Sequence, residues 1–108
     1  MEDQSGDTPV LDLLTMMTAD SIETSSLDAQ TLMLVRMAAL IAIDSPPTSY
    51  MMNLGIAGQA GVTAEQVDGV VAAVAPIVGT SRVMSAAGKM ARAYDLKLDL
   101  AGLAELDE

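Results

Sequence analysis

The chain has 108 residues, of which 51% are hydrophobic, and a net charge of −10 with neither cysteine nor histidine. This length supports one domain, and the missing side chains exclude disulfides, thiolate nucleophiles, cysteine–histidine zinc sites and imidazole acid–base catalysis. The acidic balance, without any cluster of Lys or Arg, disfavours nucleic acid as a partner. Few kinds of catalytic chemistry therefore remain open to this chain.

The first eight residues are polar and acidic without periodicity, which predicts a disordered lead-in to a single all-α domain over residues 9–106. Acidic residues stand where a signal peptide carries positive charge, and the longest apolar run, 70–78, is too short to cross a bilayer. We therefore expect a cytoplasmic protein without a membrane partner.

The apolar share of the sequence is large for a chain with only 19% charged residues. A small monomer has much surface for its volume, so the apolar excess predicts self-association. An alanine-rich helical monomer is the alternative interpretation.

The first two of about five expected helices precede a pair of prolines, and no alternating pattern indicates a strand. A short helix is expected over 10–17, fading in the polar stretch that follows. The next helix, 27–43, is capped by Ser25 or Ser26 in this interpretation. Its segment 32–43 is apolar on almost every face, which predicts that a second subunit covers part of it.

The third and fourth helices have clear end signals. The Pro46-Pro47 pair opens the third, and Gly61 is expected to end it in a left-handed conformation. Thr63 and Gln66 form a capping-box pattern that begins the fourth helix, which extends to about residue 78.

The remainder of the chain reads as a helix and a tail. Gly79 closes the fourth helix, and Ser81 is expected to cap a fifth helix over 82–93. Residues 94–108 then form an amphipathic tail with regularly spaced leucines.

Polar groups gather in the segment 44–53, at the junction of two expected helices. Ser49, Tyr50 and Asn53 fall within one helical turn, so their side chains can converge on a ligand. The plainer interpretation is that Ser45 caps the helix and that the polar side chains satisfy local backbone groups.

Arg36 is the only charged residue in the apolar segment 32–43, so its guanidinium needs a partner to offset desolvation. One interpretation is an anionic ligand. The other is a structural ion pair with Asp20, Glu23 or Asp44, or with a neighbouring subunit.

The chain has nine methionines, and thioethers are ligands for soft metals. They are spread at helical spacing among leucines and alanines, which favours packing in a core or an interface. The acidic residues are also dispersed rather than spaced as a calcium loop. The sequence therefore predicts no metal and no cofactor.

The stretch 53–67, Asn-Leu-Gly-Ile-Ala-Gly-Gln-Ala-Gly-Val-Thr-Ala-Glu-Gln-Val, resembles the central signature of the carboxymuconolactone decarboxylase and alkylhydroperoxidase D-like family. An apolar helix upstream and a glycine-ended helix downstream extend the resemblance over about 27–93. It implies an all-α fold that assembles as trimers or hexamers.

The catalytic groups of that family do not carry over. The Cys-x-x-Cys-x-x-x-His motif of its peroxidase branch falls on Pro46, Ser49 and Asn53, and the proton-relay Glu falls around Met33 or Leu34. The histidine position of the decarboxylase branch is again Asn53. The resemblance therefore implies a divergent member without thiol peroxidase activity.

Our interpretation is a helical homo-oligomer, trimer or hexamer, with a structural role or a small, mainly apolar binding pocket near Arg36, Ser49, Tyr50 and Asn53. The alternative is a lyase or decarboxylase for a small carboxylated substrate, in which Arg36 holds the carboxylate and Tyr50 moves a proton. An adaptor that binds another protein through its acidic surface or its leucine-bearing tail is a third, weaker hypothesis.

Overall fold

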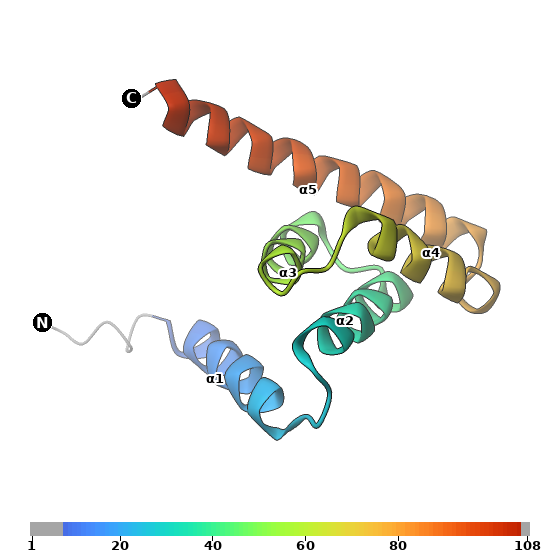
Figure 1. Ribbon diagram of the computed structural model, residues 1–108, viewed down its shortest axis with the longest axis horizontal. Coiled ribbons are helices and arrows are strands. Elements are labelled where there is room, and N and C mark those ends of the chain that lie inside the picture. Colours follow the sequence, from blue (N-terminus) through green and yellow to red (C-terminus); the bar gives the residue numbers. More distant parts are fainter. Residues whose placement is uncertain (1–7, 107–108) are drawn as a thin grey trace, which may run out of the picture.

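The computed structural model describes residues 8–106, with side chains through Tyr94, and forms five α-helices without a strand in that range (Figure 1). The all-α fold expected from the sequence is confirmed. The helices are α1 Pro9–Thr24, α2 Ala29–Ile43, α3 Pro47–Gln59, α4 Ala64–Val78 and α5 Thr80–Leu106. The disordered lead-in was predicted over residues 1–8, and residues 1–7 lie outside the described residues.

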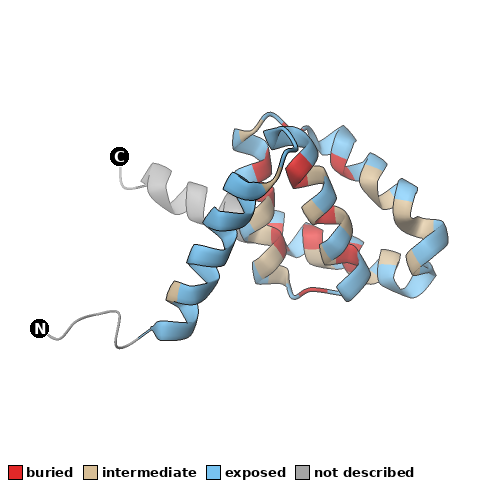
Figure 2. Cartoon of the chain, turned by 90° about the horizontal axis from the view of Figure 1, so that it is seen from below, coloured by how far each residue is buried: buried red, intermediate tan, exposed pale blue. Residues whose placement is uncertain are grey.

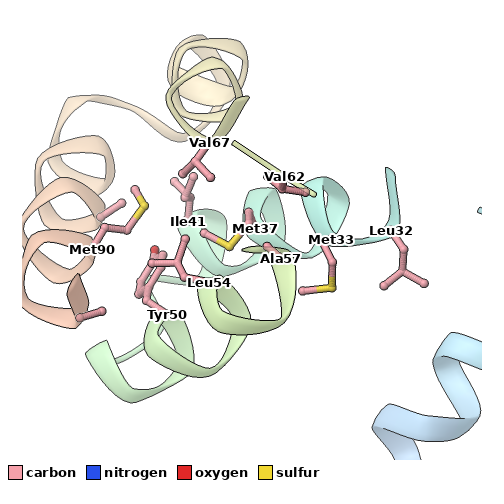
Figure 3. Close-up of a cluster of buried hydrophobic side chains, with 12 residues drawn as sticks. Leu32, Met33, Met37, Ile41, Tyr50, Leu54, Ala57, Val62, Val67 and Met90 are labelled. Atoms are coloured by element: carbon pink, nitrogen blue, oxygen red, sulfur yellow. The ribbon is translucent and has the colours of Figure 1, made fainter. Parts of the chain in front are cut away.

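Helices α2 to α5 form the packed part of the molecule. Helix α2 lies against α3 and α4, while α5 packs on α3 and α4. Their facing sides bury a continuous apolar core, shown in Figure 3. Its members are Leu32, Met33, Met37, Ile41, Tyr50, Leu54, Ala57, Val62, Val67, Ala86, Met90 and Ala93.

The turn between α3 and α4 forms as its sequence predicts. Thr63 Oγ1 accepts from the Gln66 amide at 3.1 Å, and Gln66 Oε1 accepts from the Thr63 amide at 2.9 Å, which completes the capping box. Gly61 has φ +92°, and a Cβ built there would lie 2.8 Å from Gln30 Nε2. Its positive φ favours glycine, whereas the contact is with the end of the flexible Gln30 side chain, which can move aside.

The predicted cap of α2 is wrong. Asp28 is the N-cap, and its Oδ1 accepts from the Thr31 amide at 2.8 Å. Ser25 belongs to the end of α1 instead, because its amide donates to Ser21 O at 3.0 Å. Helix α1 continues through the polar stretch to Thr24, well past the expected end.

The predicted cap of the fifth helix at Ser81 is also wrong, whereas Gly79 ends α4 as predicted. The Val83 amide donates to Gly79 O at 3.1 Å, so the helical ladder starts at Gly79 and leaves Ser81 inside the first turn. Helix α5 then runs without interruption to Leu106. The side chains of the predicted amphipathic tail beyond Tyr94 lie outside the described residues.

Helix α1 stands apart from the core. None of its residues is buried, and Figure 2 shows it exposed along almost its whole length. It carries seven large apolar side chains that face water: Val10, Leu11, Leu13, Leu14, Met16, Met17 and Ile22. No helix in the described part of the chain has both the length and the apolarity that crossing a bilayer requires.

The apolar segment of α2 is covered mainly by its own chain. Met37 and Ile41 are fully buried against the other core helices, whereas Val35 and Ile43 remain exposed. The contact of this segment with a second subunit stays a prediction.

Candidate functional site

Ser49 and Asn53 lie one turn apart on α3, and the Asn53 side chain bonds to the backbone of Ser49. Asn53 Nδ2 donates to Ser49 O at 2.8 Å, and the Ser49 amide donates to Pro46 O at 3.0 Å. The Asn53 amide group thus bonds within its own helix, as the plainer interpretation expected. Ser45 is buried and does not cap α3, whose N-cap is Pro46 without a side-chain bond.

Tyr50 lies in the core rather than in a pocket. Its ring packs among Ile41, Leu54 and Met90 (Figure 3) and the residue is fully buried. The hydroxyl has no hydrogen-bond partner. Burial raises the pKa of the Tyr50 hydroxyl, and the negative charge of Asp44 raises it further. The phenol therefore stays protonated at neutral pH and is available as a donor rather than as a base.

Arg36 joins α2 to α1. Its Nη2 donates to Ser21 Oγ at 3.0 Å and to Thr18 O at 3.5 Å, both on α1. The predicted ion pair with Asp20, Glu23 or Asp44 does not form among the described side chains. Arg36 is only half-buried, so water hydrates its charge and neutral oxygens suffice as partners.

A polar cluster that the sequence did not reveal joins the end of α2 to α5. Asp44 Oδ1 accepts from Ser85 Oγ at 2.6 Å and from Lys89 Nζ at 2.9 Å, and Lys89 Nζ also donates to Asp44 O at 3.2 Å. Asp44 has φ +58°, the left-handed conformation that ends α2. The hydrogen bond from Ser85, and then that from Lys89, lowers the pKa of the Asp44 carboxyl.

Only a weak sequence signal could have found this cluster. Ser85 and Lys89 are four residues apart and share a helix face. Their partner Asp44 lies more than forty residues earlier, and nothing local specifies that contact. Ser85 and Lys89 both donate to Oδ1 of Asp44. The cluster thereby holds the end of α2 on α5.

Two apolar hollows open on the surface, and neither is lined by Arg36, Ser49, Tyr50 or Asn53. The larger, about 430 Å³, lies between α4 and α5. The smaller, about 170 Å³, lies where the end of α1 approaches α2 and α3. The structure brings Ser49, Tyr50 and Asn53 together on α3 but gives Arg36 partners on α1, so the four-residue pocket stays a prediction.

Residues 9–92 match the carboxymuconolactone decarboxylase family. The chain belongs to this family. Comparison with curated proteins and with solved structures gives no match.

The family's catalytic positions, as the resemblance assigns them, fall at the start of α3. Pro46 is the N-cap, Ser49 stands in the first turn and Asn53 in the second. Asn53 is joined to Ser49 O, and no side chain at these three positions is a thiol or an imidazole. In this family member the segment forms the start of a helix in which the Ser49 amide and carbonyl are both hydrogen-bonded.

Proposed function

We propose that this family member is a helical subunit of a homo-oligomer, a trimer or hexamer, with a structural or small-molecule-binding role and without thiol peroxidase chemistry. The observation that carries the proposal is the exposed apolar surface of α1. Seven large apolar side chains on one helix of 16 residues face water. Burying one such side chain is worth about 1.5–3 kcal/mol, so covering even half of them strongly favours association.

The length of α1 supports the same conclusion. With 16 residues, α1 only just exceeds the length of about 12–15 residues below which an isolated helix is marginal in water, and most helices in proteins owe their stability to packing an apolar face. Helix α1 packs little of its surface on its own chain, and among the described side chains of the other helices only that of Arg36 bonds to it. A second subunit supplies the missing packing surface.

The absence of cysteine supports the chemical half of the proposal. Peroxide reduction by a thiol mechanism needs a thiolate nucleophile, and the sequence contains none. For the binding half, the smaller hollow has about 170 Å³ and an apolar lining, which suits a group the size of benzene.

Light scattering after size-exclusion chromatography tests the assembly. The expected mass is three or six times the 11.2 kDa of one chain. Leu14→Glu places a charge on the apolar face of α1 and is expected to lower the mass toward one chain. Ala19→Glu adds the same charge on the opposite, polar face and is expected to leave the mass unchanged. A monomer at micromolar concentration for the unaltered chain contradicts the proposal.

A lyase or decarboxylase activity is the second candidate, and one observation favours it. The buried Tyr50 hydroxyl has no partner and remains a protonated donor. In this candidate Arg36, which lies at α1 rather than beside Tyr50, binds the carboxylate of a small substrate. The test measures release of carbon dioxide by the unaltered chain and by the Arg36→Ala and Tyr50→Phe variants. Loss of this activity in both variants, with the oligomer intact, supports the candidate. Turnover that neither substitution changes contradicts it.

A further inference from the structure

The larger hollow, about 430 Å³, is a groove along the hairpin that α4 and α5 form. Figure 1 shows α5 turning back beside α4 after their connection at Gly79. The lining extends over 64–75 of α4 and over 83–94 of α5, about 16 Å along each helix. Because the chain reverses at Gly79, Ala75 and Val83 lie at the turn end of the groove. Ala64 and Tyr94 therefore lie at its far end.

Most of the groove is apolar. Val67 and Met90 are buried and form its floor, and its walls include Val71 and Ala87. A cavity of about 150 Å³ admits one benzene-sized group, so a groove of about 430 Å³ has room for two rings and a polar head group. This volume falls within the range of about 300–1,000 Å³ that is typical of small-molecule sites.

Two hydrogen-bond acceptors lie one turn apart on the α4 wall. Asp68 is the one charged residue among the described residues that line the groove. Ala72 lines it one turn later, and Pro76 has no amide hydrogen to donate to the Ala72 carbonyl. That carbonyl therefore lacks the donor that an uninterrupted helix supplies. A carboxylate beside such a carbonyl attracts a group that has both a positive charge and N–H donors.

The ring of Tyr94 adds an attraction for a cation from the α5 wall. Tyr94 is 39% exposed, and both it and Asp68 lie in the half of the groove away from the turn. The face of a tyrosine ring attracts an ammonium group. Among the described residues that line the groove, none is basic, and the chain has a net charge of −10. The groove thus has an apolar end at the turn and a far end that attracts a cation.

We propose that the α4–α5 groove binds a small molecule with an apolar body of about two rings and one primary ammonium group. The apolar body lies over Val67 and Met90. The ammonium donates to the Asp68 carboxylate and the Ala72 carbonyl, beside the ring of Tyr94. The inference rests on the small-molecule-binding role in the proposed function and adds to it a second site and a ligand class. Asp68 repels a carboxylate, so this ligand differs from the substrate of the decarboxylase candidate.

Three probes that share a naphthalene body and a two-carbon chain test the preference for a cation. They are naphthylethylammonium, the neutral naphthylethanol and the anionic naphthylpropionate. Titration calorimetry of the full-length chain measures each dissociation constant at low ionic strength, where exposed charges are least screened. We expect naphthylethylammonium to bind about fivefold more tightly than naphthylethanol, and naphthylpropionate to bind most weakly.

Two pairs of variants locate the binding. Asp68→Asn removes the carboxylate and is expected to reduce the fivefold preference to twofold or less, with naphthylethanol binding unchanged. Asp20→Asn removes the same charge from α1, outside the groove, and is expected to keep the preference. Ala87→Phe fills the groove and is expected to weaken naphthylethylammonium binding at least tenfold. Ala73→Phe adds the same ring at an exposed position of α4 outside the lining and is expected to leave binding unchanged.

Light scattering on the same samples separates this inference from the proposed assembly. Equal affinities for naphthylethylammonium and naphthylethanol, or a preference that persists in Asp68→Asn, overturn the inference. An oligomer that binds none of the probes also overturns it and leaves the assembly standing, with a neighbouring subunit then free to cover the groove. A monomeric chain with the expected preference, lost in Asp68→Asn, contradicts the assembly and supports the groove site.

Discussion

Helix α1 and the unit α2–α5 are both rich in apolar residues, and they differ in what covers those residues. The four helices bury twelve apolar side chains in one cluster, including Met37, Ile41 and Tyr50 at zero exposure. Helix α1 buries none of its residues, although its leucines and methionines are chemically the same. Apolar composition therefore measures how much surface needs a partner, whereas the fold decides where that surface lies.

The surface best placed for subunit contact differs from the one that the sequence indicated. The sequence directed attention to the segment 32–43, because it is apolar on almost every face. Helices α3, α4 and α5 of the same chain cover much of that segment. The larger exposed apolar surface is on α1, for which the sequence predicted only a short helix over 10–17.

Truncating a leucine in each region gives the largest expected contrast. Leu54→Ala removes a buried side chain of α3 and is expected to lower the free energy of unfolding by about 2–5 kcal/mol. Leu13→Ala removes an exposed side chain of α1 and is expected to change it by about 0.5 kcal/mol or less in the dilute monomer. Urea unfolding followed by circular dichroism measures both.

Protein concentration sharpens this contrast. If α1 is buried between subunits, the cost of Leu13→Ala rises with chain concentration, because assembly stabilises only the folded form. The cost of Leu54→Ala is present at every concentration. Equal losses for the two variants in the dilute monomer contradict the division of the chain into a covered and an uncovered part.

Tyr50→Phe tests the one buried side-chain polar atom without a hydrogen-bond partner among the described residues. A buried hydroxyl without a partner costs about 1–3 kcal/mol, so its removal is expected to raise the free energy of unfolding by about 1 kcal/mol. Thermal unfolding measures the change. A loss of stability means that the hydroxyl has a partner in the folded protein and contradicts the geometry of the core.

Local signals in the sequence predicted the parts of the fold that local chemistry determines. The Thr63–Gln66 capping box needs only residues three apart, and Gly61 needs only its own backbone conformation, so both were found. The cap of α2 was assigned to the wrong residue because Ser25, Ser26 and Asp28 all have suitable side chains. The end of α1 then uses Ser25 and leaves Asp28 for α2.

The candidate site was harder to predict because its contacts connect distant residues. Asp44 meets Lys89 across 45 positions, and Arg36 reaches Ser21 across 15. Which helix faces meet depends on packing, and no spacing rule within one helix reports it. The sequence named Tyr50 as a candidate ligand-binding residue, but its spacing from Ser49 and Asn53 is the same whether its side chain lines a pocket or lies in the core.

Arg36→Met tests the side-chain link between the two regions. It removes the bonds to Thr18 O and Ser21 Oγ but keeps much of the apolar stem. We expect faster amide exchange throughout α1 by several-fold, equivalent to about 1 kcal/mol, with the exchange of α2–α5 unchanged. Arg82→Met, which removes an exposed arginine of α5, is the matched control. Equal effects in the two variants contradict a specific role for Arg36.

The smallest expected effect concerns the cluster that holds the end of α2 on α5. The pKa of Asp44 is lowered in the folded chain, first by the bond from Ser85, so ionised Asp44 stabilises the fold. That stability is complete above the ordinary carboxyl pKa of 3.8 and disappears as pH falls through the lower folded pKa.

Ser85→Ala removes the main cause of the lowered pKa, and the pKa of Asp44 is expected to rise toward its ordinary value. Carboxyl NMR titration measures this rise, and Ser81→Ala, one turn earlier on α5, is expected to leave the pKa unchanged. If the pKa of Asp44 does not change in Ser85→Ala, Lys89 alone holds the carboxylate. The contact between α5 and the end of α2 then depends on the charge of Lys89 and not on the hydrogen bond from Ser85.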